Sequence, residues 1–262
     1  MAAACLKALL REWTIPEQIV GGDESFGPLW HVPFVSIPGF VGRSNELKRL
    51  KKVIFDPRAR RIISILGLGG IGKSRLALEL TYQIKSEYPQ YSILWIQAAQ
   101  QQTFEKDVLE IGKKLRIPGI EDDKADIKNL VKQRLSNPST GKWLLVLDNA
   151  DDEALWAKPS DSTRQEHLFV QYLPRTTNSA ILITTRARSV ATLLIGKEVI
   201  NLGSMSPDEA VKIFVYELKT PDLTSDLIAD RPTILTLVNE LAYLLLAIVQ
   251  AATSIHMTQR PV

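Results

Sequence analysis

A glycine-rich segment has the residue types and the spacing that hold a phosphate chain. Residues 67–74 read GLGGIGKS and match the pattern G-x-x-x-x-G-K-[S/T] between an apolar run and a helical pattern. Glycines let successive backbone N–H groups point inward, in conformations that a Cβ would forbid, and the following helix N-terminus adds positive potential. In this pattern Lys73 reaches the β- and γ-phosphates and Ser74 ligates Mg²⁺. A purely structural turn would not need the Gly-Lys-Ser ending, so the segment predicts nucleotide binding.

An aspartate closes another apolar run further along the chain. Residues 142–148 read KWLLVLD, which places Asp148 at the C-terminal end of a predicted strand. Ligands of open α/β sheets bind at that edge, and a carboxylate there can hold Mg²⁺ through its water shell. On its own such an aspartate is usually a turn residue. Together with the glycine-rich loop, it predicts the Walker B role for Asp148.

A third strand pattern ends in an arginine. Residues 181–186 read ILITTR. Arg186 can sense the γ-phosphate or stabilise charge during phosphoryl transfer, but it can equally be a solvated loop residue like Arg188. The spacing alone does not decide between these two interpretations.

Alternating apolar runs and amphipathic segments predict the elements that carry these residues. Uninterrupted β-branched runs suit strands that are buried on both faces of a parallel sheet, and strand–helix alternation indicates an α/β sheet with helices on both faces. The predicted strands are 62–66, 92–96, 143–147, 180–184 and 198–202. The predicted helices between them are 73–87, 103–115, 125–135, 164–172 and 188–194.

The first forty residues differ in pattern from the rest of the chain. We expect a short helix at 1–13 and then, because of Gly21-Gly22 and several prolines, an extended linker over 14–40. Aromatic side chains at Trp30, Phe34 and Phe40 would pin this linker to the domain. Ser44 is the expected N-cap of the next helix, in which Leu47, Leu50 and Ile54 recur at helical spacing.

Beyond Leu202 the pattern predicts helices only. Ser206-Pro207-Asp208-Glu209 combines an N-cap serine, a proline at the first helical position and a glutamate that completes a capping box. Residues 233–255 predict a second helix or a helix pair. The expected organisation is a leader and linker at 1–40, a P-loop NTPase domain at 41–203 and an incomplete helical annex at 204–262.

Composition and charge limit the classes of protein. With 262 residues, 45% of them hydrophobic and 23% charged, the chain has an ordinary globular composition. A net charge of +3 does not indicate nucleic acid or an anionic membrane as partner, and the single cysteine, Cys5, excludes an internal disulfide. The apolar stretch at 232–255 is interrupted by Asn239, Glu240 and Gln250, which favours a buried helix over a membrane span. We therefore expect a cytoplasmic protein.

Taken together, these motifs resemble the NB-ARC domain of STAND-class nucleotide switches, the central module of NOD-like receptors and apoptotic ATPases. The similarity is greatest to the fungal versions with tetratricopeptide repeats. Residues 65–74, 144–152 (LLVLDNADD) and 181–186 resemble the family's phosphate loop, Walker B strand and sensor segment. The resemblance implies that Arg186 contacts the γ-phosphate and that residues 202–218 begin the family's helical ARC region.

The resemblance also implies the ligand and its contacts. WHVPF at 30–34 and FVGR at 40–43 resemble the segment that lies near the adenine and ribose in this family. The implied cofactors are ATP or ADP with Mg²⁺. The implied catalytic residues are Lys73, Asp148 and Arg186, and the implied metal ligands are Ser74 and Asp148. The expected nucleotide contacts are Val41, Gly42, Arg43, Gly67, Gly69, Gly70, Ile71, Gly72, Lys73, Ser74 and Arg75.

Departures from the family pattern affect hydrolysis and the adenine side. Asn149 stands where many NB-ARC domains have a second aspartate, and an amide cannot accept a proton as a general base. Asp151 or Asp152 could supply a carboxylate instead. The family's Gly-Leu-Pro-Leu motif is YLLL at 243–246, which is expected to weaken a contact on the adenine side.

The leading hypothesis is therefore an ADP/ATP-binding regulatory switch module with slow hydrolysis at most. The alternatives are a P-loop ATPase with appreciable turnover and a STAND-type regulator that acts on DNA, although no recognition helix is evident. The winged-helix domain and repeats of the family are not found within the 262 residues. Self-association or contact with other signalling domains is expected in a full-length context.

Overall fold

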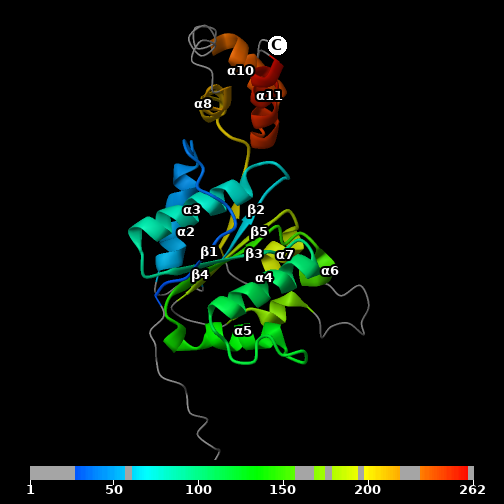
Figure 1. The fold of residues 1–262 in the computed structure, drawn as a ribbon. Helices are drawn as coiled ribbons and strands as arrows, with labels where there is room; N and C mark the ends of the chain where they lie inside the picture. Colours follow the sequence, from blue (N-terminus) through cyan, green and yellow to red (C-terminus); the bar gives the residue numbers. More distant parts are fainter. Residues whose placement is uncertain are drawn as a thin grey trace, which may run out of the picture.

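The structure is a computed structural model that describes residues 27–56, 61–156, 168–174, 179–193, 198–218 and 231–258. The helix expected at 1–13, the first part of the linker and the start of the helix expected at 164–172 lie outside these residues. Within the described part, a layered α/β body carries a smaller group of helices at one end (Figure 1).

The centre of the molecule is a six-stranded sheet in which every pairing is parallel. The strand order is β1-β3-β4-β5-β2-β6. The strands are β1 (Trp30–His31), β2 (Ile62–Leu66), β3 (Ser92–Gln97), β4 (Trp143–Asp148), β5 (Ala180–Thr185) and β6 (Glu198–Asn201). The predicted strands are confirmed to within a residue at each end. The sixth strand, β1, was not predicted. It is an edge strand inside the segment that the sequence analysis assigned to the linker.

The order of the strands determines which motifs meet. β5 lies between β2 and β4, and Ile65 of β2 pairs with Thr184 of β5 while Leu147 of β4 pairs with Ile183. Because all strands are parallel, their C-terminal ends share one edge of the sheet. The loop after β2, Asp148 at the end of β4 and Arg186 just after β5 are therefore neighbours in space.

Alternation along the strands divides the core between the faces of the sheet. On β4, Leu144 and Val146 join one apolar cluster, whereas Leu145 and Leu147 join the other, as the two-residue period of a strand requires. Helices α2 (Ser44–Phe55) and α3 (Lys73–Glu87) cover the first face. Helices α4 (Gln101–Lys114), α5 (Ile127–Ser136) and α6 (Glu153–Trp156) cover the second face, with α7 (Arg188–Leu193) beside them (Figure 1).

The helix predictions are largely confirmed, with two corrections. The described part of 164–172 holds only a 3-10 turn at Phe169–Tyr172, and Phe169 stacks on Phe104 with 4.0 Å between ring centroids. The prediction that Ser44 caps α2 is wrong, because the helix already begins at Ser44 and Arg43 holds the N-cap position at φ 57°. In this left-handed conformation, the backbone N of Arg43 donates to Glu209 Oε1, far along the chain.

The second helical group contains α8 (Pro207–Leu218), α10 (Arg231–Glu240) and α11 (Leu245–Thr258), which share one apolar cluster. We call this group the annex. The predicted capping box is present: Ser206 N and Oγ donate to Glu209 Oε2 at 3.0 and 2.9 Å, and Glu209 N donates back to Ser206 Oγ at 3.3 Å. The segment 233–255 is a helix pair. In the described residues, no helix has both the length and the apolar character that a bilayer crossing requires.

Replacing Ile183 with alanine should destabilise the fold by about 3 kcal/mol, because a buried isoleucine leaves a cavity that the neighbouring strands cannot close. Ile183 is fully buried on the central strand β5. Urea unfolding measures the change. Val35, which is 84% exposed, provides the matched control, and Val35→Ala should change stability by less than about 0.5 kcal/mol. A loss below about 1 kcal/mol for Ile183→Ala would contradict this placement of β5.

Candidate phosphate-binding site

The loop between β2 and α3 turns sharply around its glycines. Gly70 and Gly72 have φ values of 74° and 102°, where a side chain would be strained. A Cβ on Gly67 would lie 2.7 Å from the carbonyl oxygen of Leu202 at the end of β6. The loop therefore depends on glycine for its backbone angles and also for its close approach to the neighbouring chain.

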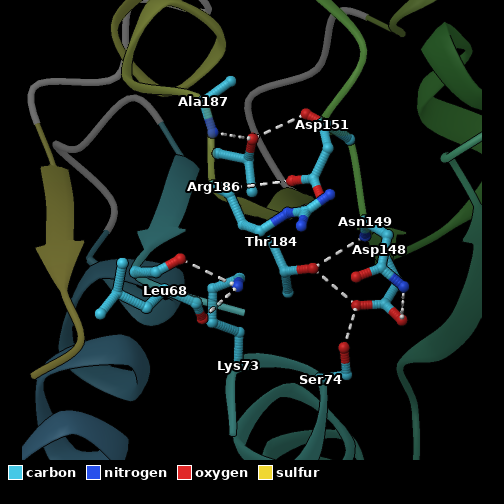
Figure 2. A network of polar contacts seen from close by, with 12 residues as sticks. Leu68, Lys73, Ser74, Asp148, Asn149, Asp151, Thr184, Arg186 and Ala187 are labelled. Atoms are coloured by element: carbon cyan, nitrogen blue, oxygen red, sulfur yellow. Dashed lines mark hydrogen bonds and ion pairs between the residues drawn. The ribbon is translucent and has the colours of Figure 1, made fainter. Parts of the chain in front are cut away.

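Lys73 is the first residue of α3 and is 6% exposed. Its Nζ donates to the carbonyl oxygens of Gly67 and Leu68, each at 3.0 Å (Figure 2). Burial lowers the pKa of the Lys73 amine; among its neighbours, Asp151 and Asp148 act in the opposite direction and Arg186 in the same direction. The Lys73 amine thus interacts electrostatically with Asp148, Asp151 and Arg186.

Asp148 is 2% exposed and is held by hydroxyl groups from two other elements. Its Oδ1 accepts from Ser74 Oγ of α3 at 2.7 Å and from Thr184 Oγ1 of β5 at 2.6 Å (Figure 2). Burial raises the pKa of the Asp148 carboxyl, although both hydrogen bonds and the charge of Lys73 partly offset this effect. The predicted metal ligands Ser74 and Asp148 are therefore in direct contact.

Thr184 is a site residue that sequence reasoning missed. Besides donating to Asp148, its Oγ1 accepts from the amide of Asn149 at 2.9 Å. Asn149 has φ 61°, a conformation in which asparagine is enriched among non-glycine residues. Thr184 is part of the ILITTR segment, so a hydroxyl at this strand end was visible in the sequence. Its partner Asp148 could not be identified, because the sequence does not show that β4 lies next to β5.

Arg186 lies at the same edge and is paired with Asp151. Its backbone N donates to Asp151 Oδ1 and its Nε to Asp151 Oδ2, both at 2.6 Å (Figure 2). The Arg186 side chain is 62% exposed and that of Asp151 is 19% exposed. Arg186 is therefore at the site, as predicted, and Asp151 joins it there.

A cleft of about 550 Å³ opens over the loop. Of the predicted contacts, its lining includes Gly69, Gly70, Gly72, Lys73, Ser74, Arg75 and Arg186. Ala99, Asn149, Asp151, Leu245, Leu246 and Val249 complete the lining. Gly67 and Ile71 of the loop do not line the cleft, and Ile71 is buried in the sheet core. The structure thus brings most of the predicted phosphate contacts together around one cleft.

The predicted base-side residues do not line the main cleft, and two of them border a narrow cavity of about 10 Å³ instead. Val41 and Arg43 line it, and it shares Gly72, Arg75 and Leu245 with the main cleft. The Arg43 guanidinium donates to the carbonyl of Gly203 at 2.6 Å and is paired with a nearby glutamate at 3.2 Å. Arg43 therefore ties α2 to the connection that leads into the annex.

Gly42 has its own close neighbour in the annex. A Cβ at Gly42 would lie 2.4 Å from Glu209 Oε1, and the same oxygen accepts from the Arg43 amide at 3.0 Å. The Glu209 side chain thus serves the capping box through Oε2 and the FVGR segment through Oε1. This double use joins the start of α8 to the start of α2.

The annex also contacts the phosphate loop itself. Leu246 N, at the start of α11, donates to the carbonyl of Gly70 at 3.0 Å. Arg75 of α3 pairs with Glu217 of α8 at 3.4 Å, and both side chains are largely buried. Leu245 occupies the proline position of the family motif, lines both cavities and packs against Gly72.

The fold and the cleft define a P-loop nucleotide-binding protein, with a glycine loop before a helix and an acidic strand end beside it. A family model described as the NB-ARC domain matches residues 43–221. The chain therefore belongs to the NB-ARC family.

The chain is similar to proteins from three organisms. The chain is 35% identical over 232 residues to a nucleotide-binding leucine-rich repeat (NLR)-like protein of Hyaloscypha variabilis, over 86% of this chain and 23% of that protein. It is 25% identical over 184 residues to disease resistance RPP13-like protein 4 of Arabidopsis thaliana, over 69% of this chain and 20% of that protein. A solved STAND protein with a tetratricopeptide repeat sensor from Pyrococcus horikoshii is similar at 21% identity and a TM-score of 0.40, over 80% of this chain and 29% of that one. The chain thus spans less than a quarter of the length of these two curated relatives.

Replacing Asp148 with asparagine should stabilise the fold at pH 7 by roughly 1 kcal/mol while it weakens function. Because the folded pKa of Asp148 is raised, ionisation at neutral pH costs stability. That cost develops as the pH rises above the ordinary value of 3.8 and disappears below it. Urea unfolding of both proteins between pH 3 and pH 7 should therefore show a difference that grows with pH. A variant that is less stable at every pH would contradict this account of the carboxylate.

Glu209 should show the opposite dependence on pH. Burial opposes ionisation, but hydrogen bonds from the amides of Ser206 and Arg43 prevail and lower the pKa of Glu209 below its ordinary value of 4.5. Glu209→Gln should lose about 1 kcal/mol at pH 7, and the difference from the natural chain should vanish as the pH falls below 4.5. Asp208→Asn, at an exposed pair with Arg231, is the control and should change little. An equal loss at pH 3 and pH 7 would contradict the role of the charge.

Proposed function

We propose that this chain is an ADP/ATP-dependent switch module with its nucleotide phosphates in the cleft over residues 67–74. Lys73 binds the β- and γ-phosphates, and the amides of the glycine loop cradle them. Arg186, which follows the neighbouring parallel strand β5 at the same edge of the sheet, contacts the γ-phosphate. The observation that carries the proposal is the position of Lys73, Ser74 and Arg186 on one cleft, with Asp148 directly beneath Ser74.

Ser74 and Asp148 are suited to Mg²⁺. The ion prefers hard oxygen ligands and keeps several waters, and a hydroxyl and a carboxylate lie 2.7 Å apart at this point. Ser74 would ligate the ion and Asp148 would hold its water shell, and an ion held there would supply positive charge to the nucleotide phosphates. The bound cation would also favour the ionised form of Asp148, which burial disfavours.

Contacts between the annex and the loop provide a route for switching. Gly70 accepts a hydrogen bond from Leu246, and Arg75 pairs with Glu217. A phosphate that draws the loop inward must therefore also move or release these contacts. The affinity difference between ADP and ATP would then bias the position of the annex.

Slow hydrolysis fits the same geometry. Asn149 cannot act as a general base, and the following carboxylates already have donors. Asp151 accepts from Arg186 twice, and Asp152 accepts from the amide of Ala154 at 2.9 Å. We place this module in the cytoplasm, where self-association or contact with other signalling domains would follow nucleotide exchange in a protein of the relatives' length.

Lys73→Ala should weaken binding of ADP and of ATP by at least about 10-fold, because it removes the charge-assisted hydrogen bonds to the phosphates. Isothermal titration calorimetry in the presence of Mg²⁺ measures both affinities. Lys106→Ala, at an exposed position on α4, is the control for loss of a positive charge and should bind normally. Undiminished binding by Lys73→Ala would rule out this loop as the nucleotide site.

A further inference from the structure

The loop after β4 holds the Asp151 carboxylate in a fixed position at the end of β5. Ala150 N donates to the carbonyl of Thr184 at 2.9 Å, and Thr185 Oγ1 donates to the carbonyl of Ala150 at 2.7 Å. The Asp151 amide in turn donates to the carbonyl of Asn149 at 2.8 Å. Hydrogen bonds between Ala150, which follows β4, and the end of β5 therefore fix the backbone next to Asp151.

The Asp151 carboxylate pairs with the backbone and the Nε side of Arg186. The two carboxylate oxygens take the backbone N and the Nε of Arg186, both at 2.6 Å (Figure 2). This geometry uses neither Nη1 nor Nη2 for the pair. The guanidinium end lies over the phosphate loop, because Arg186 Nη1 is 3.8 Å from the position that a Cβ on Gly69 would take. The end of the side chain that suits a phosphate is thus turned toward the cleft.

Without the pairing to Asp151, the exposed Arg186 side chain would become ordered only when a ligand binds. Ordering an arginine side chain costs rotamer entropy, and the Arg186 side chain is 62% exposed. The pairing with Asp151 orders part of the Arg186 side chain before a ligand binds.

We propose that Asp151 is a positioning residue that aims Arg186 at the γ-phosphate and thereby sets the preference of the cleft for ATP over ADP. This inference rests on the proposed nucleotide site. It adds a carboxylate that binds no phosphate itself and acts through the arginine. Only a triphosphate reaches Arg186, so the loss of Asp151 should affect ATP far more than ADP.

The test is calorimetric titration of the chain with ADP and with a non-hydrolysable ATP analogue, both in the presence of Mg²⁺. Asp151→Asn should lower the affinity for the ATP analogue about 5-fold relative to ADP, in line with the loss of a charge-assisted pair. Asp152→Asn removes the neighbouring charge and is the matched control, with an unchanged ratio. Asp151→Glu, which keeps the charge, should restore part of the preference.

A double-mutant cycle separates positioning from a merely structural role. In an Arg186→Ala background, Asp151→Asn should have no further effect on the ratio of the two affinities. Asp151→Ser repeats the measurement if the asparagine variant does not fold. An unchanged or increased ATP preference in either variant overturns this inference, as does an equal effect without Arg186. A natural chain that binds neither nucleotide would instead overturn the proposed function together with it.

Discussion

The buried carboxylate of Asp148 is the interaction on which the rest of the site depends. It accepts hydroxyl hydrogen bonds from α3 through Ser74 and from β5 through Thr184, so one group joins the phosphate-loop helix to two strand ends. Ionising it inside the protein costs free energy, which two neutral donors only partly offset. A site that keeps such a group gives up stability in the absence of a cation and recovers it when a cation binds.

The annex is joined to the α/β layers by polar side chains that serve both parts at once. Glu209 accepts from Ser206 in its own helix cap and from Arg43 at the start of α2. Arg75 lies on the phosphate-loop helix and pairs with Glu217 of α8. These contacts are charged or directional, and Arg75 and Glu217 are largely buried, so a shift of the annex must break them or give them new partners. Apolar burial alone would make the same junction harder to rearrange.

The sequence predicted the local features well, because each rests on a short pattern. The glycine loop, Asp148 and Arg186 could be placed at strand ends from apolar runs and turn signals alone. The sequence did not reveal the strand order, and so it could not assign Thr184 to Asp148 or Asp151 to Arg186. The conformation of Arg43 was missed for the same reason, since its partner Glu209 lies 166 residues away. Such pairings depend on tertiary contacts that local periodicity does not encode.

The position of β2 in the sheet also has a consequence for biosynthesis. The phosphate loop follows β2 directly, but both neighbours of β2 in the sheet, β5 and β6, are made much later in the chain. During translation, α2, α3 and β3 leave the ribosome before the strand that carries the loop has any partner. The loop can therefore acquire its ordered shape only after residues near 200 have emerged. A nascent chain that stalls earlier should expose an apolar strand and bind no nucleotide.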